Sequence, residues 1–203
     1  MIDTTKYQVL PRKFYIRPVL TVAKDLLGKV LIRQTDKIFF AGRIVEVEAY
    51  DGNIDEAAHT FKGKTKRNEV MFNEGGYLYV YFTYGAHYCC NVVTGKKDHG
   101  SAVLIRAIEP LGGIDEMIKN RFGRKLKNDK EIFNLTSGPG KVCKAFGINR
   151  EHSGLDLTGS QFFIIDQPKV EKNRVGISKR IGITKSVNLP WRFFEIGNPY
   201  LSR

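Results

Sequence analysis

Two carboxylates that could act in acid–base chemistry stand two residues apart, at Glu46 and Glu48, and Tyr50 follows at the same spacing. Side chains at this spacing share one face of a β-strand. Taken alone, Glu-x-Glu is more often a solvated strand face. The apolar neighbours Ile44 and Val47 indicate an interior strand instead, where a carboxylate needs a partner or a function. The segment is therefore a candidate site.

A second feature is a series of tyrosines at alternating positions. Tyr77, Tyr79 and Tyr81 share one face of a predicted strand, and Tyr84 stands beside Gly85 in an expected tight turn. Such tyrosines are usually core or interface residues with a satisfied hydroxyl group. A ring at the tip of a hairpin is not easily covered by its own fold, so Tyr84 is a candidate wedge between stacked bases.

The segment from Ser137 to Lys141 reads SGPGK and opens a predicted short helix. The serine is expected to be the helix N-cap. The free backbone N–H groups next to a lysine would also suit a phosphate. A P-loop is not predicted, because GxxxxGK[ST] is absent. Lysines and arginines at 62–67 and 119–127 are either solvated surface or further phosphate contacts.

Neither a metal nor another cofactor is predicted. Glu56 and His59 have the ExxH spacing, but no third ligand is evident, and the Pro-Cys-x-x-Cys pattern of zinc deaminases is absent. Cys89 and Cys90 are adjacent and would face opposite sides of a strand. With Cys143 they are expected to be buried free thiols in a reducing compartment.

The composition favours a polyanionic partner. The chain of 203 residues carries a net charge of +12, which suits nucleic acid or an anionic membrane face. No apolar run of membrane-spanning length and no signal-peptide pattern are seen, so a cytoplasmic protein is expected. Repeats and long linkers are also absent, and residues 1–203 are predicted to form one domain.

The elements that would position these residues are mostly strands. Strands that outnumber the helices without alternating with them indicate an α+β fold. We expect a single domain with a curved, mainly antiparallel, barrel-like sheet, packed helices and a protruding β-hairpin, and no doubly wound nucleotide fold. The predicted helices are 17–28, 114–122 and one beginning near 137, and the predicted strands are 39–50, 77–84, 87–93, 101–108, 161–166, 175–183 and 191–196.

Together these motifs resemble the alkyladenine (3-methyladenine) DNA glycosylase family. The resemblance rests first on EAY ending at Tyr50, AAH ending at His59, YVY ending at Tyr81 and the dipeptide Tyr84-Gly85. It covers nearly the whole chain from the first helix onward. Further matching segments are Arg67-Asn68, Met71-Phe72, Asn91, Leu104 to Ala107, Glu109-Pro110, Ser137 to Pro139 and, more loosely, Arg174 to Ile177 and Pro190 to Phe193.

The resemblance implies a monofunctional enzyme of DNA base-excision repair. It would hydrolyse the N-glycosidic bond of flipped-out alkylated purines such as 3-methyladenine, release the free base and leave an abasic site. Glu48 would activate the water as general base, and Arg106 would orient it, with a main-chain carbonyl near Ile177. No lysine matches a nucleophile, so no lyase step is implied. The other implied site residues are Tyr50, His59, Tyr81, Asn91 and Leu104 at the base and Tyr84 as wedge.

The implied partner is double-stranded DNA that contains alkylated bases, bound by a monomer. In a bacterium the protein would be associated with the nucleoid. We expect the DNA backbone to contact Arg67, Ser137, Gly138 and Lys141.

Two other readings of the same residues stay open. A nucleic-acid-binding module without catalysis, such as the barrel-like tRNA-contacting domain of formyltransferases, would explain the charge and the aromatic residues. It would leave Glu48, Arg106 and Asn91 without a function. A small-molecule hydrolase would need no such charge, and its binding would respond little to salt.

Overall fold

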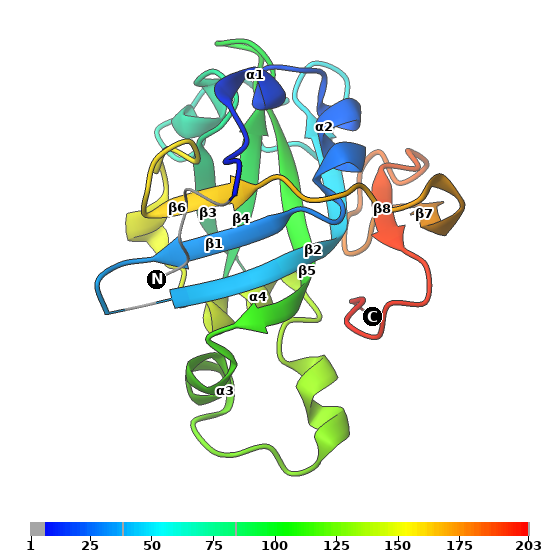
Figure 1. Cartoon of the computed structure of the whole chain (residues 1–203). Coiled ribbons are helices and arrows are strands. Elements are labelled where there is room, and N and C mark those ends of the chain that lie inside the picture. Colours follow the sequence, from blue (N-terminus) through cyan, green and yellow to red (C-terminus); the bar gives the residue numbers. More distant parts are fainter. Residues whose placement is uncertain (1–6, 38, 84, 203) are drawn as a thin grey trace.

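The longest strand, β2 (Phe39–Asp51), is the centre of the sheet (Figure 1). The computed structural model describes residues 7–37, 39–83 and 85–202. Strand β5 (Ser101–Gly112) pairs along one edge of β2, while β1 (Val30–Gln34) and β8 (Arg192–Glu195) share the other edge. The remaining strands extend the sheet on both sides and are β3 (Leu78–Thr83), β4 (His87–Thr94), β6 (Phe162–Ile165) and β7 (Val175–Ser178). The strand order is β3-β4-β5-β2-β1-β6, and β7 pairs with β8. Every described pairing is antiparallel.

The sheet curls into part of a barrel (Figure 1). Strand β2 changes register against β5 on both sides of Glu46, and such bulges bend a strand and re-aim its side chains. At Gly42 the two strands approach so closely that a Cβ atom would lie 2.1 Å from the Ile108 side chain. The bend thus falls in the strand that carries Glu46 and Glu48.

Helices cover the sheet and bury its apolar side. Helix α2 (Val19–Leu26) packs against β2 and β5 with an apolar stripe that includes Val22 and Leu26, both fully buried. Truncating such a leucine to alanine typically costs about 2–5 kcal/mol. The other helices are α1 (Arg12–Tyr15), α3 (Ile114–Phe122) and α4 (Pro139–Ala145), with 3-10 turns η2 (Glu69–Phe72), η3 (Asp129–Asn134), η4 (Arg150–His152) and η5 (Lys172–Arg174).

The expected α+β fold with a curved antiparallel sheet is confirmed, while two local predictions are wrong. The strand expected over 175–183 ends at Ser178, because Arg180 turns into the interior and Gly182 adopts a positive φ of 76°. Ser137 is not the N-cap of α4. That position is Gly138, at φ 150°, and it makes no side-chain capping bond. The sequence patterns predict neither strand β1 nor helix α1.

Among the described residues, no helix has the length and apolar character that crossing a membrane requires.

Candidate active site

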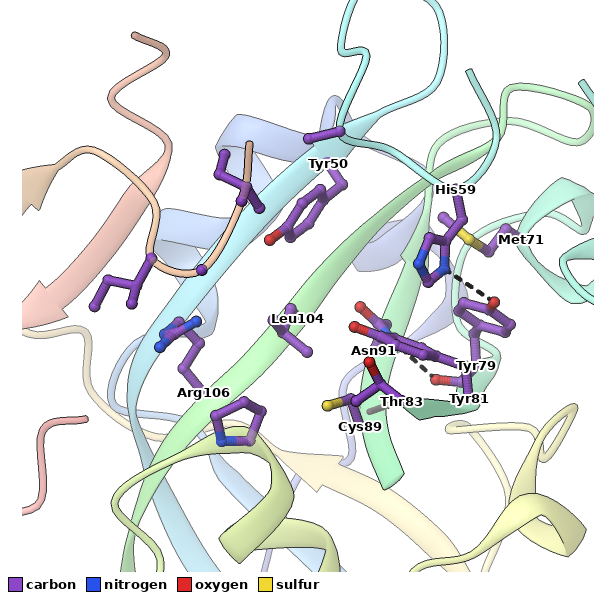
Figure 2. A pocket seen from close by; sticks show the side chains of 15 residues that line it. Tyr50, His59, Met71, Tyr79, Tyr81, Thr83, Cys89, Asn91, Leu104 and Arg106 are labelled. Carbon is purple, nitrogen blue, oxygen red and sulfur yellow. Dashed lines mark hydrogen bonds between the residues drawn. The ribbon is translucent and has the colours of Figure 1, made fainter. Parts of the chain in front are cut away.

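A cavity of about 310 Å³ lies over strands β2 to β5 (Figure 2). Each of these four strands contributes side chains to its wall, and two loops and the start of α4 complete it. The cavity therefore brings together segments that lie far apart along the chain. Its lining consists of Tyr50, Ala57, His59, Met71, Tyr79, Tyr81, Thr83, Cys89, Asn91, Leu104, Arg106, Pro139, Ile181, Gly182 and Ile183.

Aromatic rings form two opposite sides of the cavity. Figure 2 shows Tyr50 on one side, His59 with Tyr81 on the other, and Leu104 between them. The Tyr79 and Tyr81 rings are stacked with centroids 5.6 Å apart, and His59 meets Tyr81 edge to face at 4.4 Å. Ring faces and edges in this arrangement suit a planar aromatic ligand. The structure thus brings together all five residues that were predicted to contact the base, since Asn91 also lines this cavity.

The Glu48 carboxylate lies immediately behind this lining and is fully buried. Its Oε1 accepts the Ile181 N–H at 2.7 Å and faces Nη1 of Arg106 at 3.2 Å, and its Oε2 accepts the Tyr50 hydroxyl at 2.8 Å. All three donors line the cavity. They offset the cost of burying a carboxylate and fix its orientation next to any bound ligand.

The second carboxylate, Glu46, holds Arg106 in place. Glu46 is fully buried, and its Oε1 accepts bonds from Nε of Arg106 at 3.0 Å, Nε of Arg192 at 2.7 Å and the Ser202 hydroxyl at 2.6 Å. Burial alone would raise the pKa of Glu46, but the Ser202 and Arg192 donors outweigh burial and lower it. The alternative of a solvated Glu-x-Glu face is therefore wrong.

Asn91 and His59 both line the cavity, and each is held by a hydrogen bond with Tyr79. The Asn91 amide donates from Nδ2 to the Tyr79 carbonyl at 3.2 Å. Nδ1 of His59 is hydrogen-bonded to the Tyr79 hydroxyl at 3.1 Å, while the residue as a whole stays exposed. Desolvation by neighbouring groups and the nearby Arg67 charge lower the pKa of His59, which favours its neutral form.

The three cysteines are buried free thiols, as predicted. Cys89 lines the cavity, whereas Cys90 faces the core, so the two neighbours do point to opposite sides of β4. Burial raises the pKa of Cys89 to about 11. Its thiol is therefore a poor nucleophile at neutral pH.

The other expected site residues that the structure describes do not line the cavity. Arg67 is exposed, with its guanidinium 5.7 Å from the Tyr81 ring centre. Ile177 is an exposed residue of β7, and the loop that reaches Glu48 is instead the segment around Ile181. Tyr84, the expected wedge, lies outside the described residues.

Two further hollows flank the β3–β4 hairpin. The larger, of about 970 Å³, adjoins the cavity at Arg106 and is bordered by Ser137, Gly138 and Lys141. Lys141 donates to the Ser137 hydroxyl at 3.2 Å. The smaller, of about 710 Å³, runs past Arg67 on the β3 side. The larger hollow also carries His87, Arg121, Lys130 and Lys144, and the smaller one Lys66 and Arg150.

Four residues shape the site although the sequence predicts no such role for them. They are Asp55 and Arg180, which pair with each other, and Arg192 and Ser202, which contact Glu46. Asp55 and Arg180 form a buried ion pair 125 positions apart in the chain. Ser202 lies 156 positions from the carboxylate that it contacts. No periodicity or local motif links residues so distant, and only the folded sheet brings them together.

A buried carboxylate next to an aromatic cavity in a strongly basic protein is an arrangement that suits an enzyme acting on the bases of nucleic acids. The sequence profile of the family described as Methylpurine-DNA glycosylase (MPG) matches residues 13–199. The chain belongs to this family.

Curated relatives of full length agree with the profile. The chain is 48% identical over 197 residues to a protein of Carboxydothermus hydrogenoformans, with 96% of this chain and 99% of that protein covered. It is 44% identical over 200 residues to one of Alkaliphilus oremlandii, with 96% and 98% covered. Both relatives carry the name "Putative 3-methyladenine DNA glycosylase".

Proposed function

We propose that this protein is a 3-methyladenine DNA glycosylase that hydrolyses the N-glycosidic bond of alkylated purines in double-stranded DNA. The observation that carries the proposal is the Glu48 carboxylate, fully buried and held by three donors that all line an aromatic cavity. A general base must be held within reach of the water it activates, and this carboxylate is held at the edge of the base-sized space.

The target base must leave the duplex stack to enter the cavity. Tyr50 would stack on one face of the base, with Tyr81 and His59 on its other side. N-alkylated purines carry positive charge, which the electron-rich tyrosine faces attract. Leu104 and Asn91 would contact the edge of the base, where the Asn91 side chain would collide with the exocyclic amino group of guanine.

In the proposed reaction, a water molecule forms a new C–O bond to the sugar C1′ while the bond from C1′ to the base nitrogen breaks. The bonding electrons go to the base and neutralise its positive charge, and the proton of the water passes to Glu48. The carboxylate also stabilises the cationic sugar of the transition state, as in other glycoside hydrolyses. Arg106, which Glu46 orients, would hold Glu48 toward the water. The products are the free base and an abasic site.

The two basic hollows would hold DNA phosphates on either side of the hairpin. The phosphate backbone of one DNA strand would lie against Lys130 and Lys144 on the β4 side. The backbone of the other strand would lie against Lys66 and Arg67 on the β3 side. Tyr84, which follows Thr83 of β3 in the sequence, would fill the space left by the extruded nucleotide. Because the cavity and both hollows belong to one chain, we propose a monomer that binds duplex DNA in a one-to-one complex.

The test is incubation of the purified protein with methylated duplex DNA, without added metal, followed by chromatography of the released bases. The wild type should release 3-methyladenine, and Glu48→Gln should not, although it should still bind the DNA. Glu116→Gln, a change of the same kind at an exposed position on α3, should leave the release intact. Salt-sensitive DNA binding without any release would instead identify a non-catalytic binding module.

A further inference from the structure

The side chains of Asp55 and Arg180 form an ion pair that solvent does not reach, since both are 0% exposed. Nη1 of Arg180 lies 2.5 Å from Oδ2 of Asp55, and Nη2 lies 2.7 Å from Oδ1. A two-pronged contact of this kind fixes the relative orientation of both groups. The pair therefore locks the loop that follows β2 to the loop that follows β7.

On the Asp55 side, the pair fixes the turn that carries one wall of the cavity. Oδ1 of Asp55 also accepts the backbone N–H of Ala57 at 3.0 Å. Ala57 lines the cavity, and His59 follows it two residues later. The Asp55 carboxylate thus holds a short turn that leads to His59, one of the residues proposed to contact the base.

On the Arg180 side, the pair reaches both the carboxylate and the ring of the site. Nη1 of Arg180 donates to the carbonyl of Ala49, the residue between Glu48 and Tyr50, at 2.9 Å. The guanidinium lies 4.5 Å from the centre of the Tyr50 ring, a cation–π distance. The next residue, Ile181, donates its N–H to Glu48. A shift of Arg180 would therefore move a donor of Glu48 and a support of Tyr50 together.

We propose that the Asp55–Arg180 ion pair positions Glu48 and Tyr50 for base excision, an inference that rests on the proposed glycosylase function. Neither residue lines the cavity, so both act through their neighbours and are positioning residues. The site would lose its geometry without the pair even where the fold survives, because one contact holds two loops and the backbone of β2.

The first test compares Asp55→Asn with Glu195→Gln. Glu195 is a matched control, because it is a buried carboxylate paired with an arginine, Arg43, and does not line the cavity. For each variant we would measure the rate constant of 3-methyladenine release at saturating protein, the affinity for duplex DNA with an abasic-site analogue, and thermal unfolding.

We expect Asp55→Asn to lower the excision rate constant roughly 10- to 100-fold, the effect of a small misplacement of catalytic groups. Its DNA affinity, carried by phosphate contacts elsewhere, should change by less than about threefold. Glu195→Gln should lose thermal stability but keep the rate constant. Asp55→Asn with an unchanged rate constant, or equal loss in both variants, would overturn the proposal.

A second variant, Arg180→Lys, keeps the positive charge. A lysine cannot make the bidentate contact with Asp55 or place a planar group against the Tyr50 ring. Arg180 also lies 5.5 Å from the ring of Trp191, the sole tryptophan, so indole fluorescence reports on its position. We expect a folded protein with altered emission and a lowered rate constant. Altered emission with a wild-type rate constant would overturn the positioning role. A wild-type protein that releases no base would overturn the proposed function itself.

Discussion

The phenolic hydroxyl of Tyr50 donates a hydrogen bond of 2.8 Å to Oε2 of Glu48, two residues away on the same face of β2. Burial and the neighbouring Glu48 charge raise the pKa of Tyr50, so this hydroxyl keeps its proton and remains the donor at every physiological pH. One side chain thus serves both halves of the proposed site, since its ring faces the base and its hydroxyl orients the general base.

Tyr50→Phe separates these two roles. The ring is retained, so the affinity for lesion-containing DNA should stay near the wild-type value. Glu48 loses a hydrogen bond to its ionised form, which is worth about 1.5–3 kcal/mol, and the excision rate constant should fall roughly 10- to 100-fold. Single-turnover kinetics with a parallel binding titration measures both effects. Tyr50→Leu is the companion variant and should lose affinity as well, whereas weaker binding by Tyr50→Phe would contradict the division of roles.

Glu46→Gln tests the ionic cluster behind Arg106. Glu46 contacts two guanidinium groups, and breaking a buried ion pair costs about 3–5 kcal/mol of the free energy of unfolding. Since the folded-state pKa of Glu46 is lowered, its stabilising contribution is present above the unfolded-state pKa near 4.3 and is lost as pH falls through the folded value. Urea unfolding at pH 7 and at steps from about pH 5 down to about pH 2 measures this loss. The variant should be less stable at pH 7 and lose less than the wild type on acidification.

We expect the affinity of the site for a base to depend on pH through His59. Because its pKa is lowered, the ring is neutral near pH 7 and does not repel a positively charged base. Arg67 and Tyr79 are the titratable neighbours that influence or contact it. Acidification below the lowered pKa would charge the ring, so the affinity for DNA with a cationic lesion should fall in acid. The fall should be smaller in His59→Gln, and identical pH profiles in both proteins would contradict the role.

Asn91→Ser tests the choice between purines. The bond from the Asn91 amide to the Tyr79 carbonyl holds the side chain against the cavity, where a guanine amino group would collide with it. A shorter serine should make room and raise the ratio of 7-methylguanine to 3-methyladenine released from methylated DNA. Chromatography of the released bases gives this ratio directly, and an unchanged ratio would exclude Asn91 as the determinant.

Lys130 and Lys144 test the larger basic hollow as a DNA surface. Both are exposed and line that hollow. Each phosphate contact contributes roughly one unit to the slope of log affinity against log salt. Replacing both lysines by alanine should weaken binding and reduce the slope by about two. Lys97→Ala, at an exposed position outside the described hollows, is the control and should leave the slope unchanged.

Local patterns predicted the parts of the molecule that depend on nearby residues. Alternation along 39–50 predicted a strand with Glu48 and Tyr50 on one face, and Leu104 and Arg106 were expected to share a face of the neighbouring strand. The structure confirms both and joins them through the contact between Arg106 and Glu48. Alternation is enough here, because the register of an interior strand is set by its buried face.

The rest of the site depends on contacts that no local pattern contains. The strand predicted over 175–183 includes Arg180, but strand β7 ends at Ser178, and the Arg180 side chain is buried in an ion pair with Asp55. The Ser137 prediction failed for a related reason. Its backbone bridges to Ala107 of β5, and its hydroxyl accepts a bond from Lys141, so the helix begins one residue later than a capping serine would require.

The hydrogen bonds from Ser202 to Glu46 also determine when the Glu46 carboxylate can find its donors during synthesis of the chain. Glu46 leaves the ribosome 156 residues before Ser202, and Arg192 of β8 follows nearly as late. Until those residues emerge, the buried carboxylate of the central strand lacks most of its donors, and Arg106 lacks its contacts with the Ser202 hydroxyl. The proposed centre therefore cannot be complete before the segment that contains Arg192 and Ser202 has emerged, and we expect a fragment that stops short of β8 to release no base.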